Sequence, residues 1–220
     1  MSKINDDLHV GGLLTADQMQ VASGSISNDG VAANADIARS KLAQDTLAKY
    51  AIPLTSFRVH DAMQTNLPGT SANDDLALIG GTFGTNSPEI KTSDLKAAGA
   101  TTRYARALIQ LPPEYDDAQT VEIRVKGGME TTVADTSATV DVECYESDKS
   151  GGVGSDLCTT AAQSINSLTA ADKDFTITAS GLVAGDILDV RITVAVNDAA
   201  SGTAVVAALG AIELLCDIRG

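Results

Sequence analysis

The sequence predicts an all-β protein: an antiparallel, jelly-roll-like β-sandwich preceded by an extended N-terminal arm and a short helix. Segments in which apolar and polar residues alternate follow one another from Ser137 to Ile218, as half-buried strands do. No helical pattern separates the predicted strands, which indicates antiparallel sheets. Long, uneven connections favour a jelly roll over an up-and-down barrel. The lack of tryptophan and of paired cysteines argues against an immunoglobulin-type sandwich.

The two clearest strands lie near the C-terminus. The segment from Asp186 to Asn197 places five aliphatic residues on one face, namely Leu188, Val190, Ile192, Val194 and Val196. The last segment repeats this pattern with Ile212, Leu214, Cys216 and Ile218. Because alternate side chains of a strand share a face, both segments predict strands with one buried side.

Earlier segments have the same rhythm from Pro53 onward. The predicted strands are 54–59, 76–83, 103–111, 119–126, 139–145 and 175–178, and 88–95 forms either a short strand or a loop. In 103–111 the apolar positions are Tyr104, Leu108 and Ile109. Gly80 and Gly81 interrupt the second strand, where a bulge or a close backbone approach is expected.

Length and charge limit the possible classes of protein. The 220 residues favour one large β domain with an appendage over two small domains. With 15 Lys and Arg against 29 Asp and Glu, the net charge is −14, which repels nucleic acids and anionic membranes. Neither a signal sequence nor a membrane-spanning apolar run is recognised, so we expect a soluble protein made in the cytosol.

Residues 1–32 are predicted to be an extended arm that binds a partner. Their apolar residues are spread among Gly, Ser, Asn and Asp, and such a segment cannot offset an ordering entropy of about 1–2 kcal/mol per residue by burial against itself. The predicted anchors of the arm are Ile4, Leu8, Val10, Leu13 and Leu14.

Residues 33–52 are predicted to form a short helix and linker that lead into a sandwich over residues 53–220. Asn34 or Asp36 can cap a helix over 35–49, and the chain leaves the helical conformation before Pro53. The helix has a narrow apolar seam of Ala38, Leu42 and Thr46 with Leu47 or Tyr50. This seam packs either on the β body or against the same helix of sister chains.

No residue pattern points to catalysis, a metal or a cofactor. The two histidines, His9 and His60, lie far apart, which disfavours a site built on a histidine base. The paired carboxylates Asp74-Asp75, Asp116-Asp117 and Asp172 with Asp174 lie in turn-like segments, where Asp caps the backbone. Gly80-Gly81, Gly127-Gly128 and Gly151-Gly152 are interpreted as turn or bulge glycines. Of the three cysteines, Cys144 and Cys216 occupy inward positions and are interpreted as small core residues, whereas Cys158 does not.

The arm resembles the N-terminal arms of virion proteins of tailed bacteriophages. The resemblance lies in Asn5–Ala16, Ser25–Val31 and Ala35–Leu42 and covers about the first fifty residues. In capsid decoration (cement) proteins, head-fibre proteins and some tail fibres of this kind, such an arm precedes a β-rich knob.

The resemblance implies a structural virion protein that binds the outer capsid surface through its arm. The implied partner is the major capsid protein, and the implied assembly is a homotrimer with Ile37, Leu42 and Leu47 around its axis. The protein would be synthesised in the host cytoplasm and located on the virion. No enzyme activity, cofactor, metal, nucleic acid, membrane or small-molecule ligand is expected.

A competing hypothesis is a carbohydrate-recognising, receptor-binding knob of a phage tail fibre. Sugar sites favour exposed aromatic rings, and the body offers Tyr104, Tyr115 and Tyr145. A third hypothesis, a surface-layer or adhesin module, is disfavoured because no secretion signal is recognised.

Overall fold

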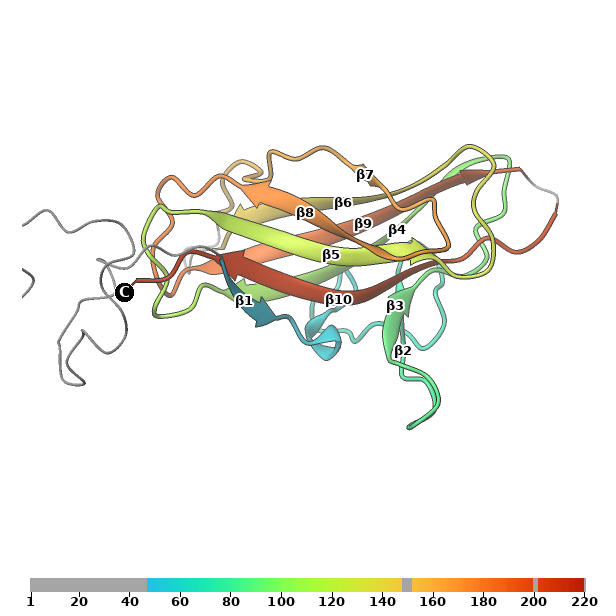
Figure 1. Ribbon diagram of the computed structural model, residues 1–220, viewed down its shortest axis with the longest axis horizontal. Coiled ribbons are helices and arrows are strands. Elements are labelled where there is room, and N and C mark those ends of the chain that lie inside the picture. Colours follow the sequence, from blue (N-terminus) through green and yellow to red (C-terminus); the bar gives the residue numbers. More distant parts are fainter. Residues whose placement is uncertain (1–46, 148–151, 200–201, 220) are drawn as a thin grey trace, which may run out of the picture. The chain divides into compact units, whose positions relative to one another are not determined.

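The computed structural model describes residues 47–147, 152–199 and 202–219, which form an antiparallel, jelly-roll-like β-sandwich (Figure 1). Sheet A has the order β2-β3-β10-β5-β8, with β1 also paired to β10. Its strands are β1 (Ala48–Ala51), β2 (Ala77–Ile79), β3 (Glu89–Lys91), β5 (Val121–Met129), β8 (Ala171–Ile177) and β10 (Ala207–Cys216). Sheet B has the order β4-β9-β6-β7, formed by β4 (Gly99–Gln110), β6 (Ser137–Glu146), β7 (Gln163–Ser164) and β9 (Ile187–Asp198). The predicted antiparallel, jelly-roll-like β-sandwich is confirmed.

The core lies between the two sheets, with β5, β8 and β10 in front of β4, β6 and β9 in Figure 1. All five predicted inward residues of β9 are fully buried. The same holds for Val121, Ile123 and Val125 of β5 and for Val140, Val142 and Cys144 of β6. Period-two alternation therefore identified the buried face of these strands correctly.

The predicted strand 54–59 is wrong. Leu54–Ser56 forms a 3₁₀ helix, in which the backbone N–H and the hydroxyl of Ser56 both donate to the carbonyl of Pro53. Pro53 favours this turn because its ring fixes φ near the helical value. Phe57 and Val59 are nevertheless buried, as an alternating pattern requires.

The predicted strand 76–83 is shorter than expected. β2 ends at Ile79, and Gly81 has a φ of 66°, so the chain turns away from the sheet. Phe83 is fully exposed beyond this turn. Gly81 marks a tight turn, since a Cβ there would come within 2.8 Å of the Asn86 carbonyl oxygen.

In β4 the buried positions are Ala105, Ala107 and Ile109, so only Ile109 of the three expected apolar positions faces the core. Leu108 is 47% exposed, and Tyr104 lies on the same outer face. The prediction assumed that the larger apolar residues face the core, whereas the small alanines occupy the inward positions of this strand.

The N-terminal end of the body also differs from the prediction. The end of the predicted helix 35–49 is wrong, because Ala48 and Lys49 belong to β1 and lie opposite Cys216 and Leu215 of β10. The edge of β10 offers backbone hydrogen bonds that a helix could not use. The body therefore includes β1, upstream of the predicted start at residue 53, and Leu47 lies half-buried just before β1.

The other predicted arm and trimer residues lie outside the described part of the chain. These are Ile4, Leu8, Val10, Leu13, Leu14, Ile37 and Leu42. Within the described residues, no helix is both long and apolar enough to span a bilayer.

Cys144 and Cys216 are buried free thiols, as their inward positions predicted. Burial raises the pKa of Cys144 to about 12 and that of Cys216 to about 11, so both thiols are neutral at physiological pH. The assignment of Gly127 and Gly128 to a turn or bulge is corrected, because both lie within β5, just past the point where it opposes a bulge in β10.

Candidate functional site

The outer face of sheet B carries a cluster of polar and aromatic side chains, which we call the sheet B face. Because the inward positions of β4, β6 and β9 are apolar, the alternate residues of the same strands point outward. The sheet B face consists of Tyr104 and Arg106 from β4, Asp189 and Arg191 from β9, and Glu143 and Tyr145 from β6.

Strand register brings these side chains together. Arg191 lies opposite Arg106 on one side and opposite Glu143 on the other. Tyr145 lies opposite Asp189. Directly opposed residues on adjacent strands have Cβ atoms about 5 Å apart, so each row across the three strands is in contact.

Two arginine–carboxylate pairs occupy the centre of the sheet B face. Arg106 donates to Asp189, with 2.7 Å between Nε and Oδ1 and a second bond from Nη2. Arg191 donates from Nε and Nη2 to Glu143 Oε2, with 2.7 Å from Nε. The bond to Asp189 raises the pKa of Arg106 further, so this guanidinium is always charged. The paired charges leave the centre of the face close to neutral.

Two half-buried tyrosines flank these pairs. The Arg191 guanidinium carbon lies 5.0 Å from the centre of the Tyr104 ring, within the range of a cation–π contact. The Tyr145 hydroxyl donates to Glu143 Oε1 at 3.4 Å. Burial, and then repulsion by Glu143, raise the pKa of Tyr145, so its hydroxyl remains a donor. The residues of β9 opposite the two rings are four positions apart, roughly 13 Å along the strand.

A loop segment borders the sheet B face beside β4. The backbones of Arg58 and Arg106 exchange hydrogen bonds of 2.8 and 3.0 Å. The amide of Tyr104 donates to the carbonyl of Asp74 at 2.7 Å. These bonds fix His60, Asp74 and Asp75 next to Tyr104, and the His60 and Tyr104 ring centres are 4.5 Å apart.

The carboxylate pairs considered in the sequence separate into different environments. Asp116 and Asp117 lie beside Arg219, and Asp174 binds Arg124 across β5 and β8, whereas Asp172 is exposed. Asp74 and Asp75 do more than cap a turn, because both face the His60 ring.

Of the three tyrosines named as candidate sugar platforms, the sheet B face contains two. Tyr115 is fully buried, and its hydroxyl donates to the Gln119 carbonyl at 2.7 Å, so it is a core residue. Tyr104 and Tyr145 lie outward on the strands either side of β9.

The charged members of the face were not identified as a site from the sequence. Alternation with the inward residues of their strands places Arg191, Asp189 and Glu143 on the outward side. Finding the site also required knowing that β9 lies between β4 and β6, and strand order is not a local property of the sequence.

An apolar hollow lies beside β10 in the described part of the chain. It has a volume of about 690 Å³ and is lined mainly by apolar groups, including Ile52, Leu54, Leu78, Pro88 and Ile212. Glu213 provides its one charged side chain. Since oriented polar groups give a ligand site its specificity, the sheet B face is the better candidate although it is not a deep pocket.

The sequence matches no protein-family model and no curated protein. Similar solved structures include a family 16 carbohydrate-binding module, with a TM-score of 0.36 and 13% identity over 67% of this chain and 88% of that chain. Another is the CBM22-1 xylan-binding domain from Paenibacillus barcinonensis, with a TM-score of 0.39 and 11% identity over 81% of this chain and 97% of that chain.

A Clostridium thermocellum xylanase chain with CBM22-1 and GH10 modules, complexed with xylohexaose, has a TM-score of 0.42 and 9% identity. The match covers 79% of this chain and 29% of that chain. Similarity at this level identifies neither a family nor a ligand for the present protein.

Proposed function

We propose that the β body is a non-catalytic carbohydrate-binding module whose ligand lies on the sheet B face. One observation carries this proposal: two outward tyrosines flank two arginine–carboxylate pairs on three adjacent strands. The proposal places the protein with the carbohydrate-recognising knobs rather than with enzymes.

The chemistry of the sheet B face suits a polyhydroxylated ligand. A sugar hydroxyl both donates and accepts hydrogen bonds, while a guanidinium supplies donors and a carboxylate supplies acceptors. The tyrosines offer ring surface for the apolar faces of sugar rings and a hydroxyl for their polar edges. The ion pairs already hold Arg106 and Arg191 in place, so less side-chain entropy is lost on binding.

The charge distribution favours an uncharged ligand. The chain carries a net charge of −14, which disfavours polyanions, yet the two arginines at the centre of the face each have a carboxylate partner. A strongly cationic ligand would have to compete with these arginines for the same carboxylates. A neutral polysaccharide meets neither obstacle.

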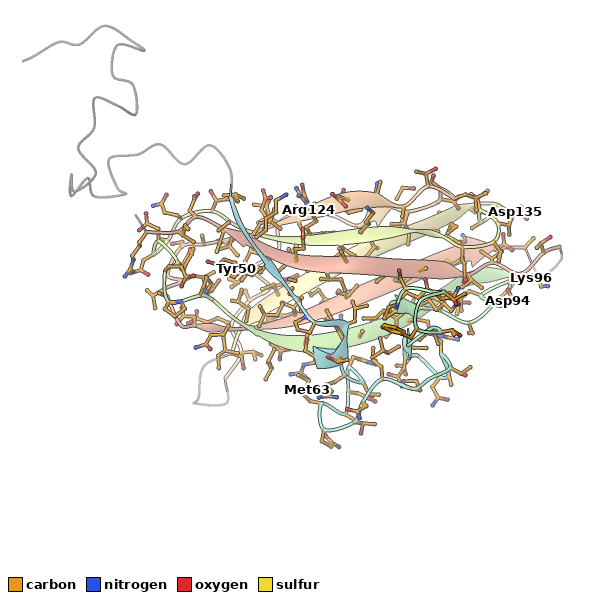
Figure 2. All side chains as sticks on the ribbon, turned by 60° about the horizontal axis from the view of Figure 1, so that its bottom comes forward. Tyr50, Met63, Asp94, Lys96, Arg124 and Asp135 are labelled. Atoms are coloured by element: carbon orange, nitrogen blue, oxygen red, sulfur yellow. The ribbon has the colours of Figure 1, made fainter. Side chains whose placement is uncertain are left out.

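The test compares two arginines in similar settings. Arg191 on the sheet B face and Arg124 on β5 of sheet A (Figure 2) each pair with a carboxylate directly opposite on the next strand. Affinity electrophoresis against glucans, mannans and xylans, followed by calorimetry on any polysaccharide bound, would measure Kd for Arg191→Ala, Tyr145→Ala and Arg124→Ala.

We expect Arg191→Ala and Tyr145→Ala to weaken binding by at least about tenfold, because central contacts dominate binding free energy. Arg124→Ala should bind as the unmodified protein does. Equal losses of affinity in the Arg124 and Arg191 variants would contradict the proposed site. Wild-type affinity in both Arg191→Ala and Tyr145→Ala would contradict it too. If no polysaccharide in the panel binds, the function itself is rejected.

The resemblance of the first fifty residues supports a second proposal, attachment to a phage capsid as a trimeric decoration or head-fibre protein. Its predicted anchors precede the described residues. Deleting residues 1–32 should abolish capsid binding and leave polysaccharide binding unchanged. A truncated protein that still coats empty capsids at full occupancy would contradict the arm hypothesis, and the mass in solution would test the trimer.

A further inference from the structure

His60, Asp74 and Asp75 form a compact cluster at the β4 side of the sheet B face. His60 Nε2 lies 3.6 Å from Asp74 Oδ2, and His60 Nδ1 lies 3.7 Å from Asp75 Oδ1. Each residue offers one ligand atom within 4.8 Å of the other two. The cluster therefore combines one imidazole nitrogen with two carboxylates.

Two atoms of the cluster are buried without a hydrogen-bond partner among the described residues: His60 Nδ1 and Asp75 Oδ1. Their separation exceeds the 2.7–3.2 Å of an N–H···O bond. The side chains of His60 and Asp75 are only 14% and 13% exposed. Buried polar atoms are normally satisfied, so these two atoms, which face each other, are candidate ligand atoms.

The backbone holds the cluster in place independently of any occupant. The carbonyls of Asp74 and Tyr104 accept backbone bonds of 2.7 and 2.9 Å between β4 and residues 74–76, and the Ser71 hydroxyl donates to the Asp75 carbonyl at 2.6 Å. On the other side, Arg106 Nη1 donates to the His60 carbonyl at 3.2 Å. His60 belongs to the loop that includes Met63 (Figure 2), and that loop is closed by a bond from the Val59 amide to the Thr65 carbonyl.

We propose that His60, Asp74 and Asp75 bind a divalent transition-metal ion of the zinc type. Imidazole nitrogen suits zinc, copper, iron and nickel, whereas sites for calcium and magnesium are made of oxygen ligands alone. Zinc bonds of 2.0–2.2 Å in tetrahedral geometry place neighbouring ligand atoms about 3.4 Å apart. The distance of 3.7 Å between His60 Nδ1 and Asp75 Oδ1 needs only a small closure to reach this spacing, whereas Asp74, which faces His60 Nε2, must move further to bind the same ion.

The local charge also favours a cation. The carboxylates of Asp74 and Asp75 lie 3.6 and 3.7 Å from the His60 ring nitrogens, and a positive ion between them would reduce their mutual repulsion. The inference stands apart from carbohydrate binding, because it concerns the loop that borders the sheet B face and its test requires no sugar.

Calorimetry with zinc chloride on the full-length, EDTA-treated protein without an affinity tag tests the site. We expect one zinc ion per chain at this site and binding at least about tenfold weaker in His60→Gln and Asp75→Asn, since even outer-shell changes cost 10–100-fold. Asp172→Asn is the matched control, an exposed aspartate on β8, and His9→Gln controls for the other histidine. Calcium chloride should bind more weakly than zinc chloride.

The melting temperature of the protein tests zinc binding independently of the calorimetric titration. Zinc should raise Tm of the unmodified protein and of Asp172→Asn, but raise it much less in Asp75→Asn. If His60→Gln does not fold, Asp74→Asn replaces it, because the Asp74 side chain is 51% exposed and tolerates the change. Zinc affinity equal to wild type in the Asp74 and Asp75 variants would overturn the proposal. Absence of zinc binding would overturn it too and leave a water or a shared proton as the occupant.

Discussion

Arginine–carboxylate pairs on the two sheets have similar geometry but different surroundings. Arg124 binds Asp174 through two bonds of 2.6 and 2.8 Å, and the Asp174 side chain is 42% exposed. The Asp189 side chain that binds Arg106 is only 9% exposed. Water screens the first pair and can solvate either partner alone, whereas Asp189 has little other solvation.

Replacing each aspartate by asparagine should lower the free energy of unfolding by different amounts for the two pairs. We expect Asp174→Asn to lower the free energy of unfolding by no more than about 1 kcal/mol. Asp189→Asn should lower it by about 1–3 kcal/mol, because a buried hydrogen-bond network is left incomplete. Urea unfolding at neutral pH measures both. Equal losses would show that burial does not distinguish the pairs.

The contribution of Asp174 should also depend on pH in a defined direction. Its bond from Arg124 lowers the pKa of Asp174 below 3.8, so the folded state binds the proton less readily than the unfolded state. The stabilisation is therefore present above pH 3.8 and is lost as the pH falls through the lowered pKa. The stability difference between wild type and Asp174→Asn should accordingly narrow in acid, and a difference that widens there would contradict this sign.

At the scale of elements, β5 and β10 show how a sheet accommodates a neighbouring loop. β10 bulges between Leu209 and Ile212, and β5 carries Gly127 and Gly128 next to this point. A Cβ on Gly128 would come within 3.0–3.1 Å of main-chain atoms of Ala170 and Ser167. A Cβ on Gly127 would instead approach the ends of the Ile165 and Leu209 side chains at 3.0 Å.

These neighbours predict that an alanine is tolerated at Gly127 but not at the adjacent Gly128. Gly128→Ala should cost about 1–3 kcal/mol, because the backbone of the loop must move. Gly127→Ala should be close to neutral, since side-chain ends can shift and alanine loses less backbone entropy on folding than glycine. Denaturant unfolding of the two variants measures the difference, and a larger loss in Gly127→Ala would show that the loop yields more easily than the core side chains.

The strands also show which predictions from sequence could succeed. In β9 and β6 most inward residues are branched aliphatic and most outward residues are polar, so alternation alone identified the buried face. In β4 the inward Ala105 and Ala107 are smaller than the outward Tyr104 and Leu108. Tyr104 occupies an outward position, where its ring contacts His60 and Arg191, and both come from distant parts of the sequence.

For the molecule as a whole, β1 extends the folded body upstream of Pro53. It pairs with β10 from Ala48 opposite Cys216 to Ala51 opposite Glu213, and the following residue, Ile52, is 7% exposed. The amide of Ile52 donates to the Ile212 carbonyl at 2.8 Å. Residues 48–52 thus cover an edge of the sheet and complete part of the core.

Two truncations test this boundary. A protein of residues 47–220 should unfold at the same urea concentration as the full chain. Residues 53–220 should be less stable by about 2 kcal/mol or more, from the lost burial of Ile52 alone, and more prone to aggregate through the exposed edge of β10. Equal stability of the two truncated proteins would show that the folded body starts at residue 53.

The sequence by itself determined the all-β class and the buried faces of β5, β6, β9 and most of β10, because alternation along a strand is local and has a period of two. Only the tertiary structure decided that β9 lies between β4 and β6, and that His60 lies beside Asp75. Arg106 and Asp189 are 83 positions apart in the chain, so no local sequence pattern predicts their contact. The candidate sites depend on strand order and loop docking, which arise from contacts between distant segments.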